Sequence, residues 1–478
     1  MIEMLYTIPI RPETCITHNA LHEHGDSQRT HCYPININIT PQVSKITGVP
    51  NAYNCLSRDD IMWVYGGCNG RDTPTDTPWV MRLEKTPIGY VKKWCTFLQV
   101  DYMDWVYPGG MLLLDKLWVV YGYRCSCICP TTGKIILTRV LPSAGHLYNT
   151  SYNGLATIDY MGTTFLIMKC FYRHHECTLD GSKALIRSKK IERDRPSYIV
   201  VMNLMGSIIC EVMAPETLGG RLSVGNGVFA SSETTIYRWI FNGVDLILNS
   251  QLPYDGGFAT AIACFTWDDK SWICFQNNAI PTREPLSLYV CQVHDDKMTV
   301  YRQLHPFKTS PSGCFSSVSV DITCLPPRIY TFDCVGGKIA CYEFPNFNCL
   351  FKCKQSTCSF ITLVNKSPRI MVSSMLIDTW HRWFFAIGVF AVAIDVYLSL
   401  IILLCGAIWL FGRQYIINVF PVLAFLPKWE RIIYRCAETG TPIYISPLIP
   451  AGTGYVLQPG NNGIAYPTMN TGEIHILD

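Results

Sequence analysis

Short apolar and aromatic runs, each following a turn, recur along the first three quarters of the chain. The runs are rich in β-branched and aromatic residues, and Gly, Pro, Asn and Asp separate them. This composition is typical of strands joined by tight turns. Apolar positions spaced by three and four residues, as an amphipathic helix requires, are nearly absent. The pattern therefore predicts an all-β domain over residues 1–360.

One unit, a turn followed at once by an apolar or aromatic strand, occurs six times in that domain. Its copies lie roughly 45 to 65 residues apart, which is a spacing expected of four-stranded propeller blades with long loops. Radial repetition also protects strand edges from pairing between molecules. We therefore expect a six-bladed β-propeller, and two β-sandwich domains are the alternative. The six units begin at Asp59, Asp115, Gly162, Gly225, Asp269 and Gly336.

A different pattern begins at Trp383, where a mostly apolar run up to Gly412 is interrupted by one charge, Asp395. A bilayer core of roughly 30 Å needs about 20 apolar residues in helical form, and helices of globular domains seldom stay apolar on every face for so long. The run predicts a transmembrane helix over residues 383–412. A buried helix of a globular domain is the alternative. Residues 361–382 would form a juxtamembrane connector.

Basic residues follow this run more densely than they precede it, with Arg413, Lys428, Arg431 and Arg435 after Gly412. By the positive-inside rule, residues 413–478 form a cytoplasmic tail and residues 1–360 form an ectodomain outside the cell. The end of the tail is rich in Pro, Gly and Asn, which predicts disorder. Within it, Tyr466 to Met469 have the Tyr-x-x-apolar form of an endocytic sorting signal.

The formal net charge is +3 and no basic stripe concentrates it, which argues against a nucleic-acid partner. Cysteine is more informative, because 21 of the 23 cysteines precede Trp383. So many thiols, without Cys-x-x-Cys pairs that have matching ligands downstream, predict disulfides formed in an oxidising compartment. The candidate partners are Cys15 with Cys32, Cys170 with Cys177, Cys264 with Cys274, and Cys334 with Cys341.

Further motifs bear on the compartment and on metal binding. Sequons at Asn38, Asn149 and Asn365 predict N-glycosylation, whereas the first fifteen residues lack the regions of a signal peptide. The histidine-rich stretch from Cys15 to Cys32 has a spacing that would suit zinc, but a disulfide that closes a surface loop is the preferred interpretation. We expect no metal and no cofactor. No nucleophile triad, P-loop or dinucleotide motif stands out.

Five short motifs follow one another along residues 1–360. They are Thr17-His18-Asn19; Tyr107-Pro108-Gly109-Gly110 with the strand Leu117 to Gly122; Gly220 to Gly225; Cys264 to Asp268 with Lys270 and Trp272; and Ile329 to Cys334 with Cys341. In this order they resemble motifs of the paramyxovirus attachment glycoproteins, the haemagglutinin-neuraminidase, haemagglutinin and G family. The resemblance implies a six-bladed head of sialidase type that binds a host receptor.

The arginines with which such sialidases hold a substrate carboxylate are missing at the matching positions. A guanidinium suits a carboxylate because it donates two parallel charged hydrogen bonds. These positions instead carry Thr7 and Asp269, and the third falls near Ser232 or Glu233. The resemblance therefore implies a head that binds and does not cleave, with Tyr330 as a weak catalytic candidate. The expected anchor also follows the head, whereas in that family it precedes the head.

The sequence thus predicts a viral envelope attachment glycoprotein in the virion envelope and host cell membrane. Its implied partners are a host cell-surface receptor, either a sialoglycan or a protein, a viral fusion protein, the membrane and further copies of the chain. An active sialidase and a cellular type I membrane receptor are the alternatives. Ligands usually bind loops and strand ends around a propeller axis, and the receptor-binding candidates are Arg221, Arg238, Arg283, Arg328 and Tyr330.

Overall fold

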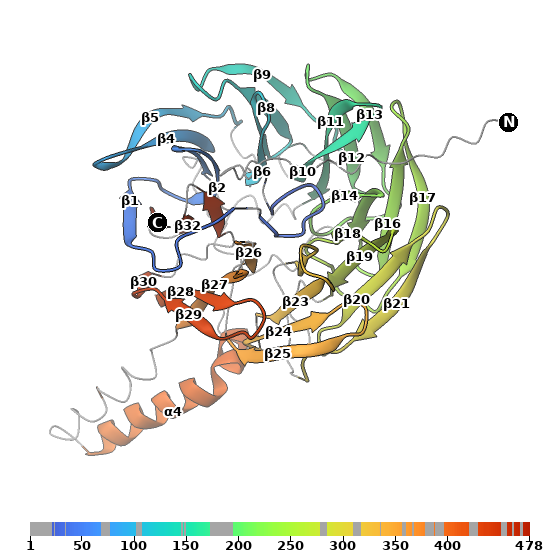
Figure 1. Cartoon of the computed structure of the whole chain (residues 1–478). Helices are drawn as coiled ribbons and strands as arrows, with labels where there is room; N and C mark the ends of the chain where they lie inside the picture. Colours follow the sequence, from blue (N-terminus) through green and yellow to red (C-terminus); the bar gives the residue numbers. More distant parts are fainter. Residues whose placement is uncertain are drawn as a thin grey trace.

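A computed structural model describes most of the chain. The described residues are 22, 24–33, 35–67, 77–101, 108–144, 147, 150–172, 195–277, 284–308, 317–334, 336–355, 360–365, 368–377, 387, 396–419, 429–450, 457–460, 463–468 and 472–478. They form eight antiparallel sheets arranged as blades around one axis (Figure 1). The predicted propeller is confirmed, and the predicted number of six blades is wrong.

Seven blades are built in chain order from the innermost strand outwards. Blades 1 to 4 consist of β2 (Ala52–Arg58), β3 (Ile61–Gly66), β4 (Trp79–Thr86) and β5 (Gly89–Phe97); β6 (Pro108–Leu113), β7 (Leu117–Tyr121), β8 (Arg124–Ile128) and β9 (Ile135–Val140); β10 (Thr150–Tyr160), β11 (Thr163–Tyr172), β12 (Tyr198–Asn203) and β13 (Ile208–Met213); and β14 (Ser223–Gly225), β15 (Gly227–Ser231), β16 (Thr235–Phe241) and β17 (Leu246–Pro253).

Blades 5 to 7 follow the same plan. They consist of β18 (Ala263–Trp267), β19 (Lys270–Gln276), β20 (Leu288–Val293) and β21 (Met298–Leu304); β22 (Ser319–Asp321), β23 (Arg328–Asp333), β24 (Lys338–Glu343) and β25 (Asn348–Lys354); and β26 (Thr362–Val364), β27 (Ile370–Ile377), β28 (Trp429–Cys436) and β29 (Pro442–Ile445), with β30 (Ile449–Pro450) also paired to β28.

Blade 8 closes the ring by joining the two ends of the described chain. Its strands β31 (Gln458–Gly460), β32 (Gly463–Thr468) and β33 (Glu473–Leu477) come from the C-terminal end, and β1 (Val43–Thr47) pairs with β33 as the outermost strand. The register runs from Val43 opposite Leu477 to Thr47 opposite Glu473. The tail expected to be disordered and cytoplasmic therefore supplies the strands from β28 to β33, and the boundaries expected at 360, 382 and 412 do not divide the propeller.

The buried side chains form eight apolar clusters, one at each junction between neighbouring blades. Inner and middle strands pack on both faces, so β7 and β8 are buried at every position, whereas β9 at the outer edge is largely exposed. Cysteine packs well in such strands because it is small and apolar. Cys125, Cys170, Cys274 and Cys341 are all buried in this way, which accounts for much of the high cysteine content.

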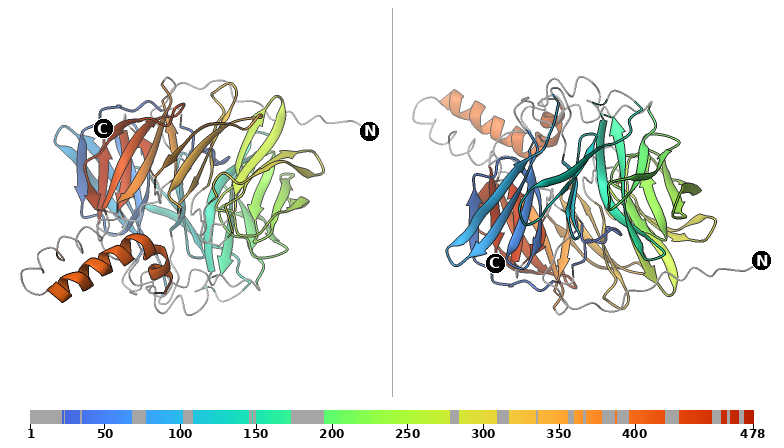
Figure 2. Two further views of the ribbon diagram at one scale, coloured as in Figure 1. Left: turned by 90° about the horizontal axis from the view of Figure 1, so that it is seen from below. Right: turned by 90° about the horizontal axis from the view of Figure 1, so that it is seen from above.

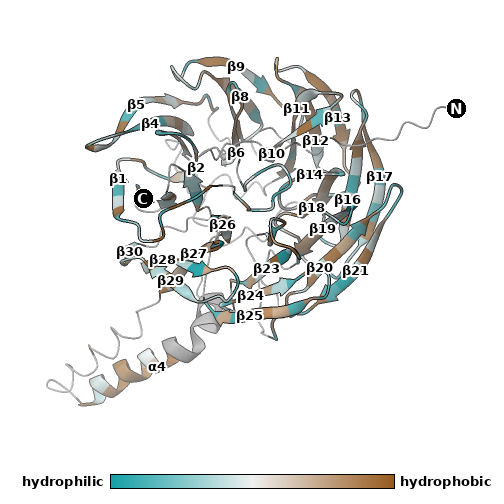
Figure 3. Ribbon diagram, viewed as in Figure 1, coloured by the Kyte–Doolittle hydropathy of each residue, from teal (hydrophilic) through white to brown (hydrophobic). Residues whose placement is uncertain are grey.

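A helix is inserted into blade 7 between β27 and β28. This helix, α4 (Val396–Val419), lies outside the ring in the edge-on views of Figure 2, and brown apolar bands alternate with paler ones along part of it in Figure 3. Among the residues that the structure describes, no helix has the length and apolar character that a membrane crossing requires. The predicted transmembrane span at 383–412 therefore gains no support, and residues 383–386 and 388–395 of it lie outside the described residues. Strands on either side of the insertion pair from Ile370 opposite Cys436 to Ile377 opposite Trp429, so the chain returns to the same sheet.

The ring requires a glycine at position 109, where β6 of blade 2 passes blade 3. A Cβ atom there would lie 1.9 Å from the backbone oxygen of Tyr152, and a backbone oxygen in a packed sheet has little room to move. We expect Gly109→Ala to lower the free energy of unfolding by about 1–3 kcal/mol, measured by urea denaturation. Gly256→Ala is the control, because its Cβ would meet no atom within 4 Å. Equal stability of the two variants would contradict this prediction.

Candidate functional site

The middle of the ring is occupied by the chain's own residues 24–33, here called the axial segment. Figure 1 shows this part of the chain in dark blue, crossing the centre of the propeller before it reaches β1. The innermost strand of each blade has one edge that faces the axis, and its backbone amides there have no neighbouring strand to pair with. The axial segment supplies acceptors for several of these amides.

Four backbone carbonyls of the axial segment accept hydrogen bonds from four successive blades. The carbonyls of residues 27, 28, 30 and 31 accept from Val224, Cys264, Val320 and Leu363, at 2.8, 2.9, 3.0 and 2.9 Å. Each donor is the second residue of its innermost strand, in β14, β18, β22 and β26. The segment therefore follows the curve of blades 4 to 7 in step with their repeat.

Side chains of the axial segment reach blade 3, and the backbone of the preceding residue His22 reaches blade 2. Ser27 Oγ accepts a 3.0 Å hydrogen bond from the backbone amide of Thr157 in β10, and His22 forms an isolated bridge with Leu112 in β6. Arg29 is fully buried and donates to two backbone carbonyls, Leu155 in blade 3 and Leu222 beside blade 4, both at 3.0 Å. These bonds satisfy carbonyls that would otherwise be buried without a donor.

Two histidines of the axial segment pack as aromatic rings and not as ligands. The ring centroids of His24 and His31 lie 4.8 Å apart. Both rings contact Phe360, with centroid distances of 4.2 Å from His24 and 4.7 Å from His31. His31 Nε2 shares a 2.6 Å hydrogen bond with Ser317 Oγ. Burial lowers the pKa of His24 well below its usual value, and the positive charges of Arg221 and Arg29 lower it further. His24 is thus held in its neutral form.

A buried charge pair fastens the end of the axial segment between blades 6 and 7. Arg369 Nε donates to Asp321 Oδ2 at 2.7 Å and Nη2 donates to Oδ1 at 3.2 Å, and these side chains are 4% and 0% exposed. Arg369 Nη2 also contacts Cys32 Sγ, and the thiol of Cys324 donates to Asp321 Oδ2 at 3.3 Å. Burial raises the pKa of the Cys32 thiol, so it stays protonated.

The polar side chains described at the axis therefore form hydrogen bonds and ion pairs within the fold. Among the described residues, no group of three His, Cys, Asp or Glu side chains could hold a metal ion. The zinc alternative for the histidine-rich stretch gains no support from His24, His31 and Cys32, which contact Phe360, Ser317 and Arg369. Cys15 and His18 lie outside the described residues.

The four receptor-binding candidates that the structure describes do not lie at one site. Arg221 alone lies at the axis, where it donates from the start of blade 4 to Tyr53 Oη in blade 1 at 2.8 Å. Arg238 is buried between blades 4 and 5 and donates to the carbonyls of Asn226 and His294. Its role is to join two blades. Arg283 lies outside the described residues.

The remaining two candidates lie between blades 6 and 7. Arg328 forms a 3.3 Å ion pair with Glu438, which is exposed. Tyr330 is fully buried and donates to the carbonyl of Ala437 at 3.0 Å, and burial raises the pKa of its phenol well above the usual value. A buried, protonated phenol bonded to a carbonyl is a packing residue and not a nucleophile.

The disulfide candidates that fall on described residues are contradicted. Cys264 lies opposite Ile273 and Cys274 lies opposite Ala263, so their side chains point to opposite faces of the sheet, and both thiols are free. Cys341 lies opposite Tyr330, four residues before Cys334, which separates the two cysteines by about 13 Å at the rise of a strand. A disulfide tolerates roughly 7 Å between Cα atoms. Cys15 and Cys177, the other expected partners of Cys32 and Cys170, lie outside the described residues.

Burial also bears on the predicted modification and sorting sites. Asn365 is 8% exposed, and its Oδ1 accepts a 2.7 Å hydrogen bond from the backbone amide of Ile37, so its amide is not available to a glycan. Asn38 is exposed, and Asn149 lies outside the described residues. Tyr466 is fully buried in β32, where its hydroxyl donates to Glu430. It cannot serve as a sorting signal in this fold. Met469 lies outside the described residues.

Two cavities of ligand size lie away from the axis. One has about 350 Å³ of open space between blades 5 and 6 and is lined by residues 305–308, Lys338 and residues 352–354. The other has about 440 Å³ between blades 4 and 5 and is lined by Asn226, residues 269–271 and residues 292–297. Sequence analysis missed both, because their lining residues come from separate strand ends.

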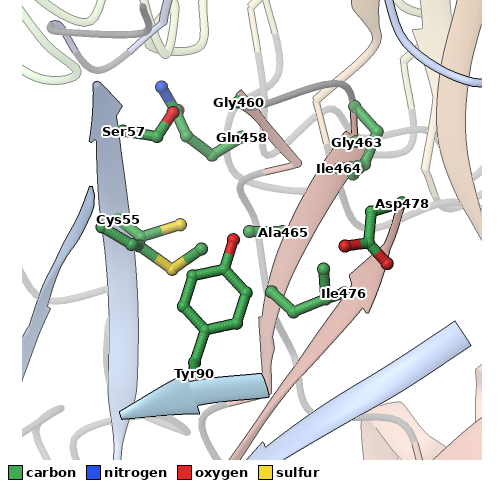
Figure 4. A pocket seen from close by; sticks show the side chains of 11 residues that line it. Cys55, Ser57, Tyr90, Gln458, Gly460, Gly463, Ile464, Ala465, Ile476 and Asp478 are labelled. Atoms are coloured by element: carbon green, nitrogen blue, oxygen red, sulfur yellow. The ribbon is translucent and has the colours of Figure 1, made fainter. Parts of the chain in front are cut away.

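A third cavity lies between blades 1 and 8, where Cys55, Tyr90, Gln458 and Asp478 surround it (Figure 4). Its volume of about 10 Å³ holds at most one water molecule. Gly460 permits this close approach, because a Cβ atom there would lie 1.9 Å from Ser57 Oγ. This junction is packed and offers no ligand site.

Comparison with known proteins places the chain by its fold alone. No family model and no curated protein sequence matches it. Among solved structures it is similar to a europium-containing methanol dehydrogenase, with a TM-score of 0.53 and 8% identity over 96% of this chain and 90% of that one. It is also similar to a quinohemoprotein alcohol dehydrogenase from Comamonas testosteroni, with a TM-score of 0.56 and 9% identity over 98% and 82%. At this identity the likeness establishes the eight-bladed propeller.

These findings overturn the assignment that rested on five sequence motifs. The structural neighbours are alcohol dehydrogenases with eight-bladed propellers, and the chain has eight blades where the resemblance implied six. The expectations of a viral attachment glycoprotein, of a sialidase-derived head and of a chain leaning towards no enzymatic activity are therefore corrected. Turn-and-strand motifs such as Tyr-Pro-Gly recur because propeller blades of any number need similar hairpins. The expected partners and location stay predictions.

Replacing Asp321 by Asn tests the charge pair at the axis. The variant leaves the Arg369 guanidinium buried without its carboxylate, so we expect the free energy of unfolding to fall by about 3–5 kcal/mol at neutral pH. Urea denaturation of this variant and of Asp115→Asn, a change at an exposed turn, measures the difference. A loss no larger than that of the control would show that the pair does not stabilise the fold.

The same pair predicts a pH dependence. Burial alone would raise the pKa of Asp321, but the Arg369 guanidinium and hydrogen bonds from Thr323 outweigh burial and lower it below its usual value of 3.8. The unfolded chain thus binds this proton more readily, and the stabilisation is complete above about pH 4 and is lost as the pH falls through the lowered pKa. The gap in stability between the wild-type chain and Asp321→Asn should narrow in that acidic range.

Proposed function

We propose that this protein binds its ligands at the rim of the propeller, at junctions between blades, while its own axial segment seals the central axis. The observation that carries the proposal is the set of four hydrogen bonds between the axial segment and β14, β18, β22 and β26. Ligands of propellers commonly use the loops around the axis. Here the chain itself occupies that position and uses its donors and acceptors.

The size and place of the cavities support this proposal. Pockets for small molecules usually measure about 300–1,000 Å³, and the two rim cavities of about 350 and 440 Å³ fall in that range. Both lie beside blade 5, in which β18, β19 and β20 pair without a register shift and the outer pair β20–β21 has one shift, between Val290 and Cys291. A rigid blade between two cavities is a suitable support for a binding site, since little ordering is needed when a ligand enters.

Hydrogen exchange of the full chain, followed by mass spectrometry, tests whether the axis is sealed. We expect the amides of Val224, Cys264, Val320 and Leu363 to exchange only when the whole propeller unfolds, because their acceptors belong to a buried segment. Amides of the exposed outer strand β9 serve as the fast-exchanging reference.

The variant Arg29→Ala sharpens this experiment. It removes both hydrogen bonds from Arg29 to the carbonyls of Leu155 and Leu222, and should raise the exchange rate of Val224 more than that of β29 on the far side of the ring. Rapid exchange of the four axial amides in the wild-type chain would show that the axis opens on its own, and would overturn the proposal.

A second candidate, an oxidoreductase acting on an alcohol, is favoured by the names of both structural neighbours. A europium ion or a similar hard cation needs several carboxylate and carbonyl oxygens converging on one point. The described residues hold no such set of acidic and histidine ligands, and the axial segment occupies the centre of the ring. The residues in this part of the chain therefore do not fit the metal that the first neighbour's name specifies.

Two readouts on the purified chain separate this candidate from rim binding. One is reduction of a redox dye by methanol or ethanol after incubation with europium(III) and a quinone, in which the alcohol would lose two electrons and two protons to become an aldehyde. The other is the emission of europium(III), which changes when protein oxygens replace bound water. We expect no alcohol-dependent reduction and no change in emission. A positive result in both would support the oxidoreductase and overturn a sealed axis.

A further inference from the structure

The cavity between blades 5 and 6 is lined by four lysines and by no carboxylate. They are Lys308, Lys338, Lys352 and Lys354. Lys308 follows β21 of blade 5, and the other three belong to β24 and β25 of blade 6. A chain whose whole formal charge is only +3 thus gathers four positive charges around about 350 Å³.

Two of these lysines face each other directly. In the register of β24 and β25, Lys338 lies opposite Lys354, and like charges in that position destabilise a sheet. Among the described residues, no ion pair links Lys308, Lys338 or Lys354 to a carboxylate. On its other side, Lys338 lies opposite the buried Asp333 in the register of β23 and β24, which offsets part of its charge. A bound anion would offset the positive charge that remains at the opening.

The other lining residues hold the cavity in shape. Lys352 Nζ donates to the carbonyl of Pro306 at 2.9 Å and lies 5.8 Å from the ring of Tyr342, so its charge is fixed beside the opening. Phe307 is 3% exposed and belongs to the apolar cluster between blades 5 and 6, where it forms the floor. His305 is exposed and bonds to Ser287 through Nδ1 at 3.2 Å.

From this arrangement we infer that the lysine cavity is a binding site for a small molecule that carries two or more phosphate groups. Lysine binds phosphate as a compact charge with three donors, and several lysines at one opening need a ligand of several charges. The inference rests on the proposed function in one respect, since it places a ligand at the rim. The cavity between blades 4 and 5 is different, because its lining mixes Asp269, Asp295 and Asp296 with Lys270 and Lys297 and so favours no single sign of charge.

Calorimetric titration of the full chain with inorganic tripolyphosphate tests the inference. We expect saturable binding that weakens with added salt, because the contacts are between charges. ATP and inositol hexakisphosphate, titrated in parallel, separate a linear phosphate chain from phosphates spread around a ring. Sulfate, at the same concentration, should bind far less, because it offers one small dianion to four lysines.

The double variant Lys338→Gln with Lys354→Gln removes the facing pair. We expect its affinity for tripolyphosphate to fall about tenfold or more, since two close charges are lost. The control, Lys92→Gln with Lys134→Gln, removes the same charge from exposed positions on β5 and beside β9 and should bind as the wild-type chain does. Equal loss in both variants would reveal general attraction between charges and would overturn the site.

Thermal unfolding gives a second readout that a merely structural role would not produce. Without ligand, the double variant should unfold close to the wild-type temperature, because it loses the repulsion between Lys338 and Lys354 together with the attraction of Lys338 to Asp333. Tripolyphosphate should raise the unfolding temperature of the wild-type chain and leave that of the double variant unchanged. An equal rise in the unfolding temperature of both proteins would contradict the inference.

Failure of this inference can be told apart from failure of the proposed function. Fast exchange of the axial amides, together with tripolyphosphate binding that the double variant loses, would overturn the sealed axis and leave the lysine site in place. Protected axial amides without tripolyphosphate binding would overturn the lysine site alone.

Discussion

The amides on the axial edges of the innermost strands must find acceptors, and the rest of the structure depends on how they do so. A propeller places these edges around a common axis, where an unpaired amide shielded from water costs free energy. The axial segment provides these acceptors, since one of its backbone carbonyls accepts a hydrogen bond from the innermost strand of each of blades 4 to 7. Beside the end of the axial segment, Arg369 and Asp321 are buried between blades 6 and 7 and form a charge pair.

Closure of the ring is the second constraint, and it explains the position of the chain ends. β1 completes blade 8 beside β33, so the axial segment and the closing strand are two parts of one N-terminal stretch. Detaching that stretch would expose the axis and open the ring together. The inserted helix α4 does not disturb this arrangement, because β27 and β28 resume pairing on either side of it.

Function follows from where the closed ring leaves space. The polar side chains described at the axis form hydrogen bonds to the blades or pack against the ring of Phe360. Open volume of ligand size lies at the junctions around blade 5. The structural neighbours share the propeller fold. A shared fold does not imply a shared activity, because function depends on the side chains of a site. In this chain, the side chains that most suit an external ligand are the lysines of β24 and β25.

Local patterns in the sequence determined that the chain is a propeller, because a turn followed by an apolar strand appears in its residues without reference to distant contacts. All six repeated units are hairpins of blades 1 to 6. The sequence did not predict blades 7 and 8. In blade 7, α4 separates β27 from β28. In blade 8, strands such as β32, which contains Pro467, have the composition of a disordered tail and are recognisable as strands only through their pairing with β33. Only the tertiary structure decided the closure by β1, the use of residues 24–33 at the axis and the presence of Lys308 and Lys338 around one cavity. These contacts join residues far apart in the chain, so no local periodicity records them.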